Sequence, residues 1–139
     1  MIAYFDTSSL MTLLVEEAGS TRARLLWNEA DHITGVRLLY AEGYATLAMA
    51  TRLGRLSTRT LRTAVISLDT LYEQIDIVEV SDHLVRRAGV LAEVHSLRGY
   101  DAIHLAAAET LSEEETIFVA GDGLLCQVAE NLGLAVART

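Results

Sequence analysis

Short apolar runs alternate with longer segments of helical periodicity along the whole chain, and this alternation constrains the fold more than any other feature. The short runs predict strands at residues 2–5, 32–35, 77–80, 116–120 and 134–137. The periodic segments predict helices at residues 10–15, 20–29, 38–53, 57–74, 81–95, 100–111 and 124–132. Strands that alternate with helices form a mostly parallel sheet covered on both faces, so we expect an α/β fold.

The length and composition suit one cytoplasmic domain that spans residues 1–139. Apolar residues make up 51% of the chain, enough for a full hydrophobic core. The single cysteine, Cys126, excludes an intramolecular disulfide and suits a reducing compartment. No apolar run approaches the ~20 residues of a membrane span, and the N-terminal residues lack the pattern of a signal peptide. We therefore expect a cytoplasmic protein with no membrane partner.

The charge of the chain limits which ligands it binds. A formal net charge of −8 argues against a general nucleic-acid-binding protein, because such proteins usually carry a basic face. A metal site, however, is itself rich in acids, and a bound cation changes the sign of the local charge. The 11 basic residues are all arginine, the better side chain for a forked contact with phosphate.

Two aspartates follow predicted strands. Asp6 comes directly after the first strand, where Ser8 or Ser9 is the expected N-cap of the first helix, and Asp122 follows the fourth strand. Ligands of parallel sheets gather outside the carboxyl ends of the strands, so both aspartates are candidates for a site.

Two further acids interrupt apolar stripes of predicted helices. Glu42 falls at helical spacing with Leu38, Ala45 and Met49 in the segment LLYAEGYATLAMA, and Asp101 does the same in LRGYDAIHLAAA. The first of these segments is apolar almost all round, which predicts a buried helix. A lone buried carboxylate is costly and shifts its pKa or finds a partner.

Four converging carboxylates would need cations, and Mg²⁺ and Mn²⁺ prefer oxygen ligands. A pair of such ions can activate water and stabilise the leaving oxygen in phosphoester cleavage. Each acid also has a simpler interpretation. Asp6 can cap the first helix, and Glu42 can pair with Arg37 or Arg52. Asp101 and Asp122 are residues that often occur at a helix N-terminus. Spacing alone does not show that the four converge.

Four segments together resemble a known family. They are MIAYFDTSSLMTLL, AEGYATLAMATRLGRL, LRGYDAIHLAAAE and FVAGDGLLCQVAENLGL, in this order along the whole chain. With them the chain resembles the PIN-domain ribonucleases, in particular the VapC-type toxins of toxin–antitoxin pairs. The segment from Tyr100 to Ala108 is the most specific of these matches.

The resemblance implies a three-layer α/β/α fold with an acidic pocket that binds Mg²⁺ or Mn²⁺. It assigns the family's four acidic positions to Asp6, Glu42, Asp101 and Asp122. In that assignment Asp6 and Asp101 are direct metal ligands, and the other two complete the site directly or through water. Ser8 matches a small polar position that helps to orient the first acid.

The resemblance also implies partners, and it includes one departure. A homodimer and a cognate small antitoxin that blocks the acidic pocket are both expected. Many relatives carry Thr or Ser two residues before the fourth acid, whereas this chain has Ala120. A missing hydroxyl that would orient a ligand weakens metal binding by roughly ten-fold or more, which puts the role of Asp122 in doubt.

Several other side chains are candidates for the site. Arg52 and Arg55 lie in the densest basic stretch, RLGRLSTRTLR, and Arg98 precedes Asp101, so all three are candidate RNA contacts or, alternatively, solvated surface. His104 lies three residues after Asp101 and could be a metal ligand. A packed and hydrogen-bonded core histidine is the simpler interpretation.

Our prediction is a metal-dependent endoribonuclease that acts as the toxin of a toxin–antitoxin pair. The alternative is a non-catalytic binding module on the same fold, with structural acids. A third class comprises phosphatases and response-regulator receivers with an aspartate after the first strand. Such a phosphatase needs a second aspartate where Ser8 lies, and the receiver needs a lysine, which this chain lacks.

Overall fold

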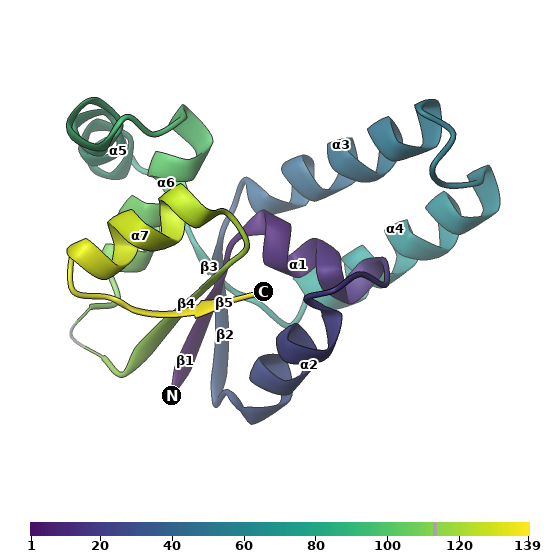
Figure 1. Ribbon diagram of the computed structural model, residues 1–139, viewed down its shortest axis with the longest axis horizontal. Coiled ribbons are helices and arrows are strands. Elements are labelled where there is room, and N and C mark those ends of the chain that lie inside the picture. The colour runs from purple at the N-terminus through teal and green to yellow at the C-terminus, as the bar shows by residue number, and fades with distance from the viewer. Residues whose placement is uncertain (113) are drawn as a thin grey trace.

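A five-stranded parallel sheet forms the centre of the fold in the computed structural model, which describes residues 1–112 and 114–139 (Figure 1). The strands are β1 (Ile2–Phe5), β2 (His32–Val36), β3 (Asp76–Val78), β4 (Thr116–Ala120) and β5 (Ala135–Arg138). Their order across the sheet is β3-β2-β1-β4-β5, and every neighbouring pair is parallel. The predicted α/β fold with a parallel sheet is therefore confirmed.

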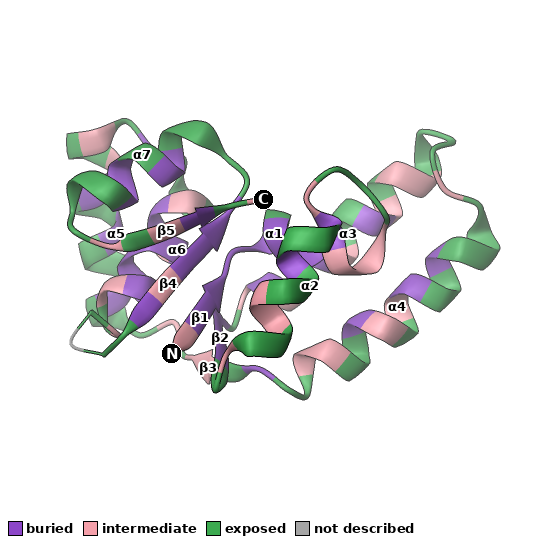
Figure 2. Cartoon of the chain, turned by 60° about the horizontal axis from the view of Figure 1, so that its bottom comes forward, coloured by how far each residue is buried: buried purple, intermediate pink, exposed green. Residues whose placement is uncertain are grey.

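Two groups of helices cover the two faces of the sheet (Figure 1). One group packs on the core that contains Phe5 and consists of α1 (Thr7–Leu14), α2 (Ser20–Glu29), α3 (Leu39–Arg52) and α4 (Thr58–Tyr72). The other packs on the core that contains Tyr4 and consists of α5 (Asp82–His95), α6 (Gly99–Glu109) and α7 (Gly123–Asn131). The result is a three-layer α/β/α arrangement. Figure 2 shows the buried central strands and the α3–α4 hairpin, which projects beyond the sheet.

Alternation along β1 explains how one strand serves both cores. Successive side chains of a strand point to opposite faces, so Ala3 and Phe5 enter one core and Tyr4 enters the other. All three side chains are fully buried. The strand therefore reads as a continuous apolar run, as expected for the middle of a parallel sheet.

The strand order reverses between β1 and β4. Chain order runs from β1 through β2 to β3 on one side, whereas β4 and β5 lie on the other side of β1. In such sheets, ligands bind in the crevice outside the carboxyl ends of the strands at this switch point. Asp6 directly follows β1, and Asp122 lies two residues after β4. The topology thus brings two of the four candidate acids to the switch point.

One predicted helix start is wrong. Helix α1 begins at Thr7, and its N-cap is Asp6 in place of the expected Ser8 or Ser9. The reason is that the Asp6 carboxylate accepts the backbone N–H of Ser9 at 2.9 Å, so the chain passes from strand to helix without a loop. The other predicted boundaries lie within two residues of those in the structure.

The expectation that helix 38–53 is buried all round is also wrong. Only Leu39, Gly43 and Leu47 are buried in α3, whereas Ala45 and Met49 are exposed. The helix belongs to the projecting hairpin, so only its inner face meets α1 and α4. Glu42 therefore lies at the edge of the buried face. Across the described residues, no helix combines the length and apolar character that a membrane span requires.

Candidate active site

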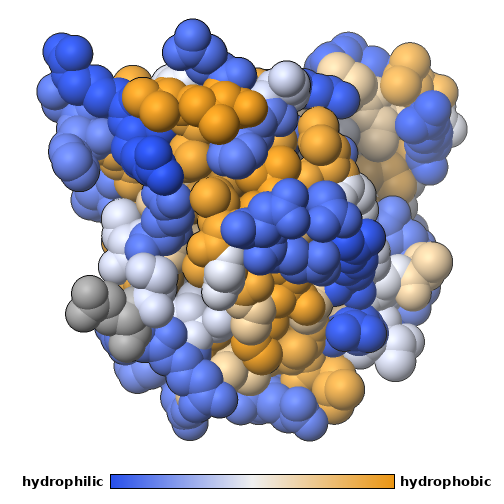
Figure 3. Space-filling model, turned by 60° about the vertical axis from the view of Figure 1, so that its left-hand side comes forward, coloured by the Kyte–Doolittle hydropathy of each residue, from blue (hydrophilic) through white to orange (hydrophobic). Residues whose placement is uncertain are grey.

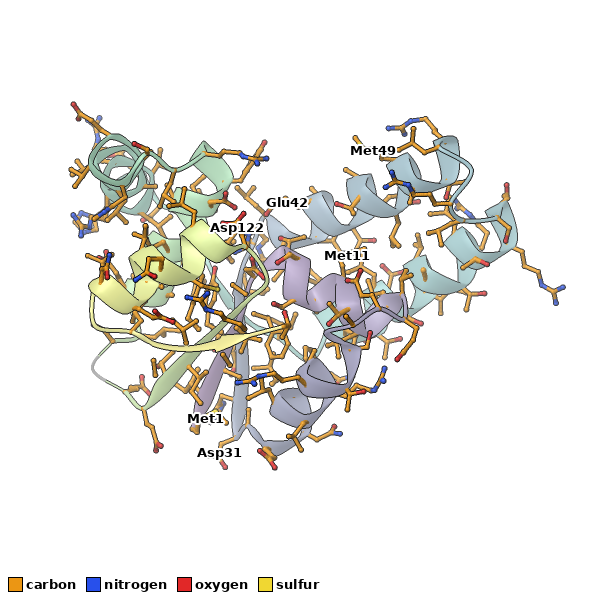
Figure 4. The ribbon with its side chains drawn as sticks, viewed as in Figure 1. Met1, Met11, Asp31, Glu42, Met49 and Asp122 are labelled. Carbon is orange, nitrogen blue, oxygen red and sulfur yellow. The ribbon has the colours of Figure 1, made fainter. Side chains whose placement is uncertain are left out.

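One pocket at the carboxyl edge of the sheet contains all four candidate acids. Asp6, Glu42, Asp101 and Asp122 line it, together with residues of α1 and α3. Figure 4 shows Glu42 at the start of α3 and Asp122 at the start of α7. The structure therefore brings the four acids to a common pocket.

Asp6 is the most buried of the four acids. Its exposed fraction is 4%, and both carboxylate oxygens accept hydrogen bonds from the Ser8 hydroxyl, at 2.8 and 2.9 Å. Burial raises the pKa of Asp6, whereas the hydrogen bonds from Ser9 and Ser8 act in the opposite direction. Asp6 caps α1, as the simpler interpretation of this residue predicted. The same residue also lines the pocket.

Ser8 connects the first acid to the loop that carries the fourth. Besides donating to Asp6, its hydroxyl accepts the backbone N–H of Gly121 at 3.2 Å. A β-carbon at Gly121 would lie only 3.3 Å from this hydroxyl oxygen, so glycine permits the close approach. Ser8 therefore holds the end of β1 against the start of the segment that leads to Asp122.

Glu42 has partners that the sequence did not indicate. Its Oε1 accepts a hydrogen bond from the Thr7 hydroxyl at 3.1 Å and lies 2.8 Å from Nε2 of His104. The alternative interpretation, in which Glu42 pairs with Arg37 or Arg52, is not what the described residues show. Arg37 instead pairs with a glutamate just after β3, Glu79, and donates to a tyrosine of α4.

Asp101 and Asp122 approach the pocket from two helix N-termini. Asp101 lies in the first turn of α6, where burial raises its pKa and the charge of Asp122 raises it further. Asp122 is exposed and caps α7, because its Oδ1 accepts the backbone N–H of Leu125 at 2.8 Å. Both residues lie at helix N-termini, as their simpler interpretation predicted. Both also line the shared pocket.

The residue before this loop, Ala120, is fully buried and offers no hydroxyl to the pocket. Its backbone oxygen instead accepts the N–H of Thr139 at 3.1 Å. The helix cap fixes the carboxylate of Asp122 on its own, and Ser8 holds the adjoining Gly121. These contacts supply part of the orientation that a hydroxyl at position 120 would give.

Of three residues near the acids, the sequence did not single out Tyr4 and Thr7, whereas His104 is the packed and hydrogen-bonded histidine that was expected. Tyr4, Thr7 and His104 form a buried polar group beside Glu42. The spacing of two of these residues from the acids could have identified them in the sequence. Tyr4 lies two residues before Asp6, on the same side of β1, and His104 lies three residues after Asp101, on the same side of α6. Because strand and helix periodicity each point to one face, both residues belonged with the acids.

Two of the three candidate arginines line the pocket. Arg55 and Arg98 do so, whereas Arg52 does not. Within residues 1–112 and 114–139 neither Arg55 nor Arg98 forms a salt bridge. Beyond the acids, the pocket continues along an apolar wall formed by Met11, Val15, Leu47 and Leu56.

The donor set suits a hard divalent cation. The four acids and Ser8 offer only oxygen atoms, which Mg²⁺ and Mn²⁺ prefer. Burial raises the pKa of Asp101, and the charges of Asp122 and Glu42 raise it further, a repulsion that a cation would relieve. In the described part of the chain, however, no three acidic, histidine or cysteine side chains are arranged so that they could hold a metal ion as they stand. Mg²⁺ keeps several waters and needs only one or two carboxylates, so an open arrangement fits it.

Sequence comparison decides the family. The model of the PIN domain matches residues 3–137. The chain belongs to the PIN-domain family. Two relatives, the ribonucleases VapC45 and VapC49 of two strains of Mycobacterium tuberculosis, are each 35% identical to it over 136 residues, which cover 98% of this chain and 94% of theirs.

Solved structures of PIN-domain relatives have the same fold. The toxin VapC20 of Mycobacterium tuberculosis, which cleaves the sarcin–ricin loop, superposes with a TM-score of 0.69 at 18% identity and covers 99% of both chains. VapBC-5 of the same organism, a toxin–antitoxin system, superposes with a TM-score of 0.62 at 13% identity and covers 99% of this chain and 98% of its own. At these identities the likeness supports the PIN fold.

Proposed function

We propose that this PIN-domain protein is an endoribonuclease that uses Mg²⁺ or Mn²⁺ and acts as the toxin of a toxin–antitoxin pair. The observation that carries the proposal is the convergence of four carboxylates on one pocket at the switch point of the sheet. The ribonuclease names of relatives at 35% identity support RNA as the substrate. Because RNA is the substrate, the proposed place of action is the cytoplasm.

In the proposed site, Asp6 and Asp101 bind the cation directly, and Glu42 and Asp122 complete the site directly or through water. A bound cation would lower the pKa of water and stabilise negative charge on the phosphate. The chain itself orients Asp6 through Ser8 and Asp122 through the cap of α7. Arg98 and Arg55, which line the pocket, would bind the RNA backbone in this proposal.

The same pocket suits a proposed antitoxin. Its acidic end attracts a basic side chain, and its apolar wall at Met11, Val15 and Leu47 can bury an adjoining apolar segment. Relatives in solved structures belong to toxin–antitoxin systems, which supports such a partner. An antitoxin that fills this pocket would exclude both the cation and the RNA.

We also propose a homodimer. Helix α5 exposes Val90 and Val94, one helical turn apart on the same face, with exposed fractions of 50% and 66%. Figure 3 shows apolar surface between polar side chains on the side of the molecule that carries α5 and α7. Burial of this surface against a second copy would remove apolar area from water.

Cleavage of total cellular RNA by the purified chain tests the activity. We expect cuts at defined sites with Mg²⁺ or Mn²⁺, no cuts with a chelator, and none with Asp6→Asn or Asp101→Asn, both folded by circular dichroism. Full metal-dependent activity in either variant would contradict the site. If the wild-type chain binds no Mn²⁺ in calorimetry and cuts no RNA, the alternative of a non-catalytic binding module with structural acids is favoured.

A further inference from the structure

A continuous chain of hydrogen bonds leads from the core to Glu42, and the proposed mechanism does not use it. The Tyr4 hydroxyl lies 3.0 Å from Nδ1 of His104, and Nε2 of His104 lies 2.8 Å from Oε1 of Glu42. Tyr4 is fully buried, and His104 is 2% exposed. Burial of a tyrosine hydroxyl and an imidazole costs free energy unless both are hydrogen-bonded. Apolar side chains would fill the same space without this cost, so packing alone does not require these hydrogen bonds.

The direction of each hydrogen bond follows from the protons available. A tyrosine side chain carries one hydroxyl proton that it can donate. Among the hydrogen bonds of residues 1–112 and 114–139, Nδ1 of His104 is the one partner of this hydroxyl. Tyr4 therefore donates to Nδ1 of His104, which leaves the imidazole proton on Nε2. That N–H points at the carboxylate of Glu42.

One oxygen of Glu42 is thereby occupied. Oε1 accepts from both the Thr7 hydroxyl, at 3.1 Å, and His104, at 2.8 Å. Among the described residues, Oε2 accepts no hydrogen bond from another side chain or from the backbone. A carboxylate with one oxygen fixed twice has few ways to rotate, so its other oxygen keeps a defined place in the pocket.

We propose that Tyr4 and His104 are positioning residues that fix the orientation of Glu42 and so prepare it for the divalent cation. This inference rests on the proposed metal site. The two residues act through Glu42 and contact neither the cation nor the RNA. Partners of this kind hold a metal ligand in place, and their loss typically weakens metal binding by about ten-fold or more.

A pair of matched substitutions separates positioning from packing. His104→Gln can present an amide N–H near the place of Nε2, whereas His104→Asn is too short to reach Glu42. We expect calorimetry of the otherwise metal-free protein to give an Mn²⁺ Kd about ten-fold higher for His104→Asn. His104→Gln should bind Mn²⁺ more tightly than His104→Asn. Leu91→Ala, in the same core as Tyr4, should lower Tm and leave the Kd unchanged.

A double-mutant cycle tests whether His104 acts through Glu42. In a Glu42→Gln background, His104→Asn should cause little further loss of Mn²⁺ affinity, because the two residues form one unit. Additive losses would overturn the inference. Equal Kd values for wild type and His104→Asn would also overturn it, while leaving the proposed metal site intact. Failure of the wild type to bind Mn²⁺ would instead contradict the proposed function.

The imidazole itself gives a readout that needs no metal. Long-range ¹H–¹⁵N spectra distinguish a proton on Nε2 from one on Nδ1, and we expect the metal-free wild type to carry it on Nε2. Tyr4→Phe removes the donor to Nδ1, so a mixture of tautomers should appear and Mn²⁺ affinity should fall. A wild-type proton on Nδ1 would overturn the inference.

Discussion

Asp101 and Asp122 line the same pocket, and the pKa of Asp101, which burial raises, is raised further by the charge of Asp122. The two side chains come from different helix N-termini, those of α6 and α7. A helix N-terminus favours an acid, but each acid disfavours the charge of the other. The helix N-termini therefore compensate the negative charge of the pocket only in part. A divalent cation would neutralise more of it.

A first prediction concerns metal-induced stability. Mn²⁺ at about 100 times its Kd should stabilise the folded chain by about 2.7 kcal/mol, which differential scanning fluorimetry detects as a rise in Tm. Asp101→Asn should lose most of this rise. Asp82→Asn is the matched control, because Asp82 lies in the first turn of α5, outside the pocket. The same Mn²⁺-induced rise in Asp101→Asn and wild type would remove Asp101 from the site.

A second prediction concerns the buried charge of Asp6. Because burial raises the pKa of Asp6, its ionised form costs stability at neutral pH when no cation is bound. Asp6→Asn keeps a side chain that can cap α1, so we expect it to raise the metal-free free energy of unfolding by about 0.5–2 kcal/mol. Urea unfolding at pH 7 with a chelator measures this difference.

The sign of the pH dependence follows from the direction of that shift. Below the pKa of an unfolded aspartate, about 3.9, Asp6 is protonated in both states and costs nothing. The advantage of Asp6→Asn should therefore be full at neutral pH and shrink as the pH falls through the pKa of folded Asp6. An advantage that grows toward acid pH would show that the folded carboxylate has a lowered pKa.

The sequence predicted that Asp6 and Asp122 each follow a strand, because a strand and the residue after it are neighbours along the chain. Apolar runs followed by Asp6 and Asp122 place both at the carboxyl edge of any parallel sheet. The spacing could not say that β1 and β4 are neighbours, since strand order depends on how distant helices pack. That neighbouring pair is what brings the two aspartates together.

The partner of Glu42 lay beyond sequence reasoning for the same reason. Glu42 and His104 are 62 positions apart, and their contact depends on how α3 and α6 meet above the sheet. A nearby arginine was the alternative partner that the sequence offered, whereas Arg37 turns toward Glu79 just after β3. Helical spacing placed His104 on the face of Asp101 but gave no information about α3.

A third prediction concerns Ser8, whose hydroxyl joins Asp6 to Gly121. Ser8→Ala removes a donor to Asp6 and leaves the N–H of Gly121 without this acceptor, so Mn²⁺ affinity and the cleavage rate should each fall by roughly ten-fold. Ser67→Ala, on α4 and outside the pocket, should change neither. Calorimetry and single-turnover cleavage measure the two effects. An unchanged Kd would mean that the cap of α1 orients Asp6 by itself.

A fourth prediction assigns Arg98 to binding the RNA backbone. Arg98 is exposed at the pocket, so Arg98→Ala should raise KM several-fold while metal affinity stays unchanged. The loss should shrink at high salt, because a phosphate contact releases counterions and its contribution falls as salt rises. Arg62→Ala, an exposed arginine of α4 outside the pocket, is the matched control for net charge. Cleavage kinetics at two salt concentrations measure both variants. If Arg62→Ala raises KM as much as Arg98→Ala does, the effect belongs to net charge and Arg98 has no specific contact with RNA.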